Sequence, residues 1–150
     1  MIIKISKVAT NNNVSADYMW KKLAEFSNFA WHPEIAASKD VGSTPDGSSN
    51  MIGAERIIVN ASGHELVETV TAWSEDTKYY ACSIDKGAPP FAKEMVIGFQ
   101  VREDGNSKAL VDMIVDIQLK APFIVLTPLL KFVLGKKLDG FVDGVANPEQ

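Results

Sequence analysis

One stretch near the end of the chain, residues 127–145, combines a helix start with a long apolar stripe. Thr127 can accept a hydrogen bond from a free backbone N–H as an N-cap, and Pro128 suits the first helical position. The stripe recurs at steps of three and four residues and consists of Leu130, Leu134, Leu138, Phe141 and Val145. Such a helix would be roughly 27 Å long, about the width of a small domain. Because the rest of the chain is rich in strands, we expect this helix to bury its stripe against a sheet.

Five segments between residues 54 and 119 have the pattern of strands joined by short turns. They span residues 54–60, 65–73, 78–86, 94–103 and 108–119. In the last of them, apolar residues such as Val111, Met113 and Val115 alternate with Asp112 and Asp116. This alternation is typical of a sheet with one buried and one wet face. Hairpin connections, strongest at residues 104–107, make the sheet antiparallel.

The N-terminal third predicts a strand at residues 3–9, a helix, a short helical turn and a strand at 35–41. Ser15 is a plausible N-cap for that helix. Its apolar face consists of Met19, Trp20, Leu23 and Phe26. Residues 42–50 follow as a polar loop. We therefore expect one α+β domain over residues 1–150. Its curved, seven-stranded antiparallel sheet would wrap around a long C-terminal helix, with one or two short helices after the first strand.

Composition restricts the possible functions. The net charge of −4 and pI of about 5.1 argue against a nucleic-acid-binding protein, which normally carries a basic stripe. The single cysteine, Cys82, excludes an intramolecular disulfide and suits a reducing compartment, where it would be a small buried hydrophobe. Pro128 and Lys131 interrupt the longest apolar run, and the N-terminus lacks a signal-peptide pattern. We expect a soluble, cytoplasmic protein without stable membrane insertion.

Arg56 and Glu68 are the first candidate functional residues. If residues 61–63 form a three-residue hairpin loop, Asn60 pairs with His64, and Arg56 then faces Glu68 on the neighbouring strand. On the wet face this would be a surface ion pair worth at most about 1 kcal/mol. On a cavity face the pair could meet a carboxylate or carbonyl group of a ligand. Alternation along the strand leaves both faces possible.

His32 is the second candidate, because it lies between Trp31 and Pro33 where the first helices would meet a pocket mouth. It could act as a general acid or base near neutral pH, or it could simply bond to the backbone of a packed corner. Asp112 and Asp116 lie about 13 Å apart on one strand, too far to act as a catalytic pair, and we expect both to be solvated. We expect no metal site, since His32 with Glu34 and the distant His64 lacks a third ligand at a suitable spacing.

Several short motifs in this order resemble the polyketide cyclase/dehydrase branch of the START-like, birch-pollen-allergen-like (SRPBCC) superfamily, whose shape is called a helix-grip. The matching residues are Trp20 with Phe26, Trp31-His32-Pro33 with Ile35, Gly53-Ala54-Glu55-Arg56, Gly63, Leu66-Val67-Glu68, Tyr80 with Ile84, and Ala88-Pro89-Pro90. The resemblance implies a helix-grip fold and a pocket for hydrophobic or amphipathic small molecules, and it favours the cavity face for Arg56 and Glu68. Many relatives carry Trp near Met113, so methionine there implies more room or a softer wall. The fold does not imply one reaction.

We therefore expect a protein that binds or carries a lipid or polyketide-like molecule between the sheet and the C-terminal helix. The alternative is a cofactor-independent cyclase or dehydratase, in which His32 or Glu68 acts as acid/base and Arg56 polarises a carbonyl. The residues expected at the ligand are Trp31, His32, Arg56, Glu68, Tyr80, Phe91, Phe99, Met113, Leu130, Phe132 and Leu134. We expect no cofactor, no nucleic-acid partner, and a monomer or homodimer. The helix glycines, Gly135, Gly140 and Gly144, would allow either close packing or movement of the helix.

Overall fold

The computed structural model describes residues 2–26, 29–40, 51–105 and 108–146. Seven strands are present in these ranges: β1 (Ile2–Asn11), β2 (Ile35–Asp40), β3 (Glu55–Asn60), β4 (Glu65–Ser74), β5 (Tyr79–Lys86), β6 (Ala92–Glu103) and β7 (Ala109–Leu119). Two α-helices and two short 3-10 helices complete the described chain: α1 (Ala16–Ala24), η1 (Phe29–Trp31), η2 (Ala121–Leu126) and α2 (Thr127–Ala146). The predicted order of elements is confirmed.

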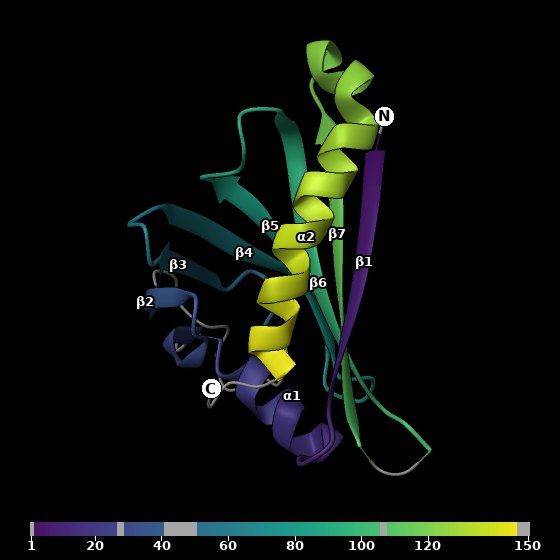
Figure 1. The fold of residues 1–150 in the computed structure, drawn as a ribbon. Helices are drawn as coiled ribbons and strands as arrows, with labels where there is room; N and C mark the ends of the chain where they lie inside the picture. The colour runs from purple at the N-terminus through teal and green to yellow at the C-terminus, as the bar shows by residue number, and fades with distance from the viewer. Residues whose placement is uncertain (1, 27–28, 41–50, 106–107, 147–150) are drawn as a thin grey trace.

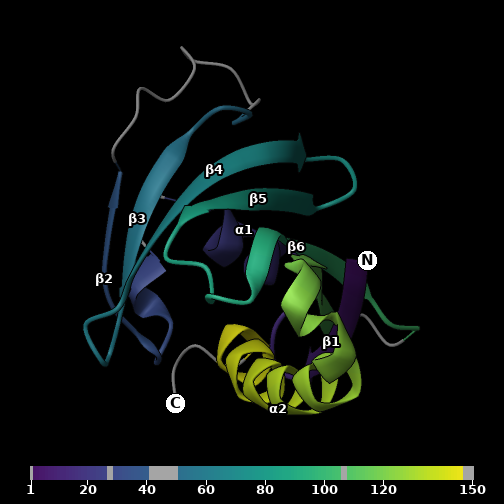
Figure 2. The ribbon, with the colours of Figure 1, turned by 90° about the horizontal axis from the view of Figure 1, so that it is seen from above.

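The strands form one antiparallel sheet in the order β1-β7-β6-β5-β4-β3-β2. Seen from above, the sheet is an arc, and α2 lies across its open side (Figure 2). Every connection from β2 to β7 joins neighbouring strands, so only β1 pairs with a strand distant in sequence. This is the predicted α+β helix-grip arrangement.

The core lies between the concave face of the sheet and the helices. Along β7 the odd-numbered side chains, including Val111, Met113 and Val115, are buried, as the alternation predicts. The C-terminal half of α2 contributes Val142, Val145 and Ala146, which are also fully buried. The N-terminal half of α2 is less covered, because it lies alongside β1 and β7 near the end of the sheet (Figure 1).

Helix α1 closes one end of the barrel-like arc, near the C-terminal end of α2 (Figure 1). Ser15 caps it as predicted, since its hydroxyl accepts a hydrogen bond of 3.1 Å from the backbone N–H of Tyr18. The apolar face of α1 places Met19, Trp20 and Leu23 in the core. The break expected at Ser27-Asn28 and the loop expected at residues 42–50 lie outside the described residues.

The start of α2 differs from the prediction. Thr127 has a helical backbone (φ −48°, ψ −50°) in place of the extended conformation of an N-cap, and its hydroxyl donates to the carbonyl of Ile124. The reason is that η2 leads directly into α2, so the chain is already helical before Pro128. Among the helices in the described ranges, none is long and apolar enough to cross a membrane.

Candidate ligand-binding site

A cavity of about 710 Å³ lies between the inner face of the sheet and α2. Its walls are mainly apolar and come from the six strands β2 to β7 and from α2. The principal apolar lining residues are Ile58, Leu66, Ile84, Met95, Ile97, Phe99, Met113, Leu134, Leu138 and Phe141. The volume falls within the range of about 300–1,000 Å³ that is usual for small-molecule pockets.

Arg56 and Glu68 line this cavity and are both almost fully withdrawn from solvent, at 1% and 4% exposure. They are direct partners in the register of β3 and β4, and Asn60 pairs with His64 across the hairpin, as the predicted loop requires. Glu68 Oε1 accepts a 2.8 Å hydrogen bond from Nε of Arg56 and lies 2.8 Å from Nη2 in the same ion pair. Arg56 and Glu68 therefore lie on the inner face of the sheet, one of the two faces that the sequence allows.

Two aromatic rings lie against the Arg56 guanidinium. Its Cζ lies 4.2 Å from the ring centroid of Phe26 and 4.5 Å from that of Phe29. Nη1 donates to the backbone carbonyl of Phe26 at 3.1 Å. Burial disfavours the charge, but the adjacent Glu68 carboxylate, with Tyr80 and Cys82 contributing, raises the pKa of Arg56 above its ordinary value. Arg56 therefore remains charged inside the molecule.

The second carboxylate oxygen of Glu68, Oε2, has no hydrogen-bond partner among the residues that the structure describes. A carboxylate can accept several hydrogen bonds, so Glu68 keeps acceptor capacity after binding Arg56. Since Glu68 lines the cavity, this capacity is available to a molecule that enters it. The ion pair is thus both a structural element of the sheet and a polar feature of the cavity wall.

His32 is fully buried but does not line the cavity. Its Nδ1 accepts a 3.0 Å hydrogen bond from the backbone N–H of Glu34, so the ring proton lies on Nε2, which donates to the carbonyl of Phe141 at 2.8 Å. The ring also stacks on Phe141, with centroids 4.0 Å apart. Burial lowers the pKa of His32, which favours this neutral form. His32 therefore links the segment before β2 to α2, and both of its ring nitrogens are hydrogen-bonded.

The close fit at this corner depends on one of the helix glycines. A Cβ atom at Gly144 would lie 2.6 Å from Nε2 and 2.7 Å from Cε1 of His32. At Gly135 a Cβ would make an ordinary contact of 3.5 Å with Lys7, and at Gly140 it would meet nothing within 4 Å. Gly144 thus allows α2 to pack closely against His32, and not against the sheet.

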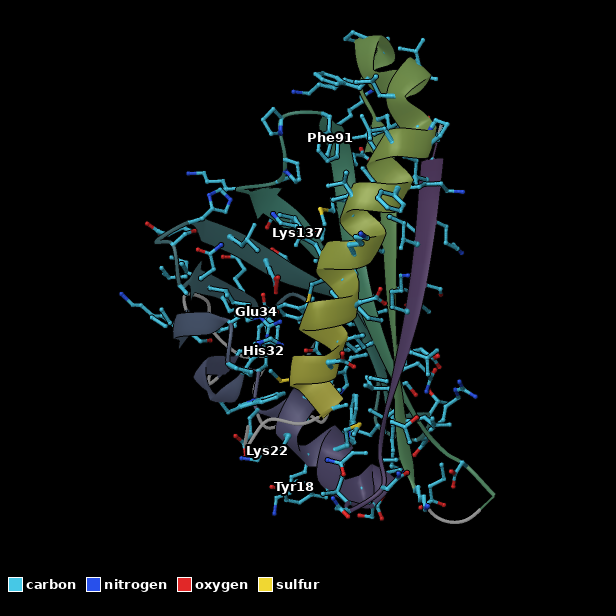
Figure 3. All side chains as sticks on the ribbon, viewed as in Figure 1. Tyr18, Lys22, His32, Glu34, Phe91 and Lys137 are labelled. Atoms are coloured by element: carbon cyan, nitrogen blue, oxygen red, sulfur yellow. The ribbon has the colours of Figure 1, made fainter. Side chains whose placement is uncertain are left out.

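The remaining predicted ligand residues divide into two groups. Phe99, Met113 and Leu134 line the cavity. The side chains that do not line it are Trp31, Tyr80, Phe91, Leu130 and Phe132. Figure 3 shows His32 and Glu34 beside the C-terminal half of α2, and Phe91 near its N-terminal half.

Three of the side chains outside the cavity have a local reason for their position. Tyr80 is completely buried behind Phe99, and burial raises the pKa of its hydroxyl, which stays protonated. Trp31 packs on Phe29, with ring centroids 5.0 Å apart. Phe132 is 62% exposed, contrary to the prediction that it forms part of the cavity wall, because it lies on the outer face of α2.

Two parts of the cavity rim were not predicted from the sequence. Lys137 of α2 and Glu34, which precedes β2, both line the cavity. The tip of the β3–β4 hairpin lines it as well, and His64 there bonds to the carbonyl of Gly87 at 2.7 Å. The hairpin turn and the Ala88-Pro89-Pro90 segment are visible in the sequence, but the contact between these distant loops is not.

Other ionisable residues lie away from the cavity. Asp112 forms an ion pair of 2.6 Å with Arg102, and Asp116 lies 3.9 Å from Lys4. Cys82 is buried, and burial raises the pKa of its thiol to about 12. Within the described ranges, no group of three or more His, Cys, Asp or Glu side chains could hold a metal ion.

Comparison with known proteins identifies the fold. No protein-family model and no curated protein matches the sequence. Among solved structures, a START superfamily protein from Mycobacterium smegmatis has a TM-score of 0.71 and 16% identity, with 95% of this chain and 94% of that chain covered. Ara h 8.0201 has a TM-score of 0.70 and 12% identity, covering 99% of this chain and 98% of that one.

Norcoclaurine synthase from Thalictrum flavum, solved in complex with dopamine and hydroxybenzaldehyde, has a TM-score of 0.70 and 15% identity. The match covers 97% of this chain and 85% of the synthase chain. The chain therefore has the helix-grip fold of the START-like (SRPBCC) proteins, as the sequence motifs predict. The TM-scores of these matches establish the fold. Their low sequence identities do not identify a ligand, which has to be argued from the cavity.

Proposed function

We propose that this protein binds a hydrophobic or amphipathic small molecule, such as a lipid or a polyketide-like compound, in the cavity between the sheet and α2. The observation that carries the proposal is a cavity of about 710 Å³ with apolar walls and one buried ion pair. Apolar walls with a few placed polar groups are the usual composition of small-molecule sites. The resemblance in fold to norcoclaurine synthase, which was solved with two small molecules bound, supports the same proposal.

The ion pair favours a ligand with a neutral hydrogen-bond donor at its polar end. Glu68 neutralises the charge of Arg56 at 2.8 Å, so a carboxylate entering the cavity would meet a pair with no net charge. It would also approach the negative Glu68 directly. A hydroxyl or amide N–H could instead donate to Glu68 Oε2. Alcohols and phenols are therefore better candidates than fatty acids.

A cofactor-independent cyclase or dehydratase is the second candidate. Its support is the position of Glu68 and Arg56 on the cavity wall. There Glu68 could accept a proton and Arg56 could polarise a carbonyl group. His32 is a poor acid/base group, because both of its ring nitrogens are hydrogen-bonded to the backbone. Turnover of a polyketide-like substrate that is lost in Glu68→Gln would favour the enzyme, whereas binding without turnover favours the carrier.

Titration with a fluorescent apolar probe tests the binding proposal. We expect saturable binding of one probe molecule to the purified protein, with competition by a long-chain alcohol. Leu134→Trp places a larger side chain in the cavity wall and should weaken binding, whereas Leu129→Trp adds the same indole on the exposed outer face. Absence of binding, or equal binding by the two variants, would overturn the proposed site.

A further inference from the structure

The outer surface of the segment leading into α2 is unusually apolar. Of the ten large hydrophobic side chains that stand out as exposed in the described part of the chain, six fall within ten consecutive residues. They are Ile124, Val125, Leu126, Leu129, Phe132 and Val133, called here the 124–133 patch. Their exposure ranges from 36% for Ile124 to 82% for Val125. Apolar side chains gathered on one surface mark an interaction site more often than scattered ones do.

The fold does not need these side chains for its own packing. Leu129, Phe132 and Val133 lie on the outer face of α2, while the inner face presents Leu130 and Leu134 to the core. Figure 1 shows η2 and the first turn of α2 extending beyond the end of the sheet. The patch is therefore an unpartnered face at the tip of the molecule.

The second half of the same helix shows the contrast. There the outer face carries Asp139 and Asp143, which are exposed and charged, as is usual for a helix face in water. The apolar outer face is thus confined to the first turns of α2 and to η2. A general lack of polar residues in α2 does not explain it.

The charges in the segment that carries the patch have one sign. From residue 120 to residue 138 the chain contains four lysines and no Asp or Glu, although its net charge is −4. The lysines are Lys120, Lys131, Lys136 and Lys137, and all four are exposed. The Lys136 Nζ lies 4.7 Å from the centroid of the Phe132 ring, so basic and apolar groups are in direct contact.

We propose that the 124–133 patch docks on the surface of an anionic lipid bilayer. Apolar side chains would enter the boundary between headgroups and acyl chains, and the lysines would lie at the level of the phosphates. A second copy of this chain is a poorer occupant, since patch-to-patch contact would bring both sets of lysines together. The helix lies in the interface and does not cross the bilayer, in agreement with its hydropathy.

The docked position has a consequence for the cavity. Leu134 lines the cavity and directly follows Val133 of the patch, so both sites share one helix. Docking would therefore hold one wall element of the cavity at the bilayer surface. The docking proposal itself does not rest on ligand binding, and either can fail alone.

Vesicle sedimentation of the full chain tests the docking. The probe is phosphatidylcholine vesicles with about 30% phosphatidylserine, compared with pure phosphatidylcholine. We expect binding to the anionic vesicles only, decreasing as salt increases. Val125→Ser combined with Phe132→Ser should reduce the bound fraction at least about tenfold, because both side chains that would insert most deeply are removed. Val8→Ser changes an exposed apolar residue on β1, away from the patch, and is the control that should bind normally.

The charge contribution has its own matched pair. The double variant Lys131→Glu with Lys136→Glu should abolish binding to anionic vesicles. The control, Lys21→Glu with Lys39→Glu on α1 and β2, makes the same change in net charge and should keep most of the binding. Circular dichroism of each variant reports whether it is folded. Three results would overturn the proposal: no sedimentation of the wild type, equal loss in patch and control variants, or a dimer in solution that the patch substitutions dissociate.

Discussion

Arg56 and Glu68 lie opposite each other on β3 and β4 and form an ion pair of 2.8 Å in the interior of the molecule. The pair is placed there by the hairpin register, and Phe26 and Phe29 stack on the guanidinium. Burial of two charges is costly, and Glu68 keeps acceptor capacity toward the cavity after binding Arg56. Orientation of a bound molecule is the role proposed above.

The buried pair predicts strongly non-additive effects on stability. Arg56→Met leaves Glu68 charged and unpaired, and we expect the free energy of unfolding to fall by about 3–5 kcal/mol. Glu68→Leu should have a similar effect. The double variant should cost much less than the two single losses together, because it leaves no isolated charge. Urea unfolding monitored by tryptophan fluorescence measures all three.

The surface pair of Arg102 and Asp112 is the matched control. Arg102→Met removes an Arg–carboxylate ion pair of similar length on an exposed face, and it should change stability far less than Arg56→Met. If Arg56→Met is no more harmful than Arg102→Met, the interior pair is not the buried, tightly coupled unit described here.

Gly144 and Gly140 make a second matched pair. Gly144→Ala forces a Cβ to within 2.6 Å of the His32 ring, and we expect a loss of about 1–3 kcal/mol from the displaced corner. Gly140→Ala meets nothing within 4 Å and should add up to about 1 kcal/mol through helix propensity. Thermal unfolding of the two variants should shift in opposite directions. A stabilised Gly144→Ala variant would mean that His32 does not pack against α2.

His32 predicts a pH dependence of stability on the acidic side of neutrality. Burial lowers its pKa in the folded state below the ordinary value of 6.5, an effect that the Phe141 carbonyl and Glu34 only partly oppose. As the pH falls below 6.5, the unfolded chain takes up a proton that the folded chain resists, so stability is lost. Above 6.5 this contribution is fully present and constant.

The measurement is urea unfolding of the wild type and His32→Gln at about pH 7.5 and about pH 5.5. Glutamine retains an N–H donor for the Phe141 carbonyl but does not titrate. The wild type should lose more stability than the variant over this interval. An equal loss in both proteins would show that His32 is not the group responsible.

The fold was predictable because several local signals agree. Alternation along β7, turn residues between strands and the Ser15 cap each specify one element, and hairpin connections then determine most of the sheet order. The register of Arg56 with Glu68 followed from loop length alone. Thr127 was assigned wrongly as an N-cap because nothing in its local pattern shows that η2 is already helical.

The cavity was less predictable, because it depends on contacts between residues distant in sequence. Strand alternation placed Phe99 and Met113 on the inner face, and helix periodicity did the same for Leu134. Strand alternation does not show that Tyr80 lies behind the lining. Phe132 lies off the apolar stripe of the helix, so its assignment to the cavity went against the helix periodicity. The engagement of both His32 nitrogens depends on the position of α2, which local sequence does not encode.

The methionine side chains allow the most direct test of ligand binding in the cavity. Met95 and Met113 line the cavity, whereas Met19 is buried in α1 away from it. In protein labelled with ¹³C at the methionine methyl groups, titration with a long-chain alcohol should shift the Met95 and Met113 signals and leave Met19 in place. Unchanged signals from Met95 and Met113 at saturating alcohol would contradict the central claim that this cavity is the ligand site.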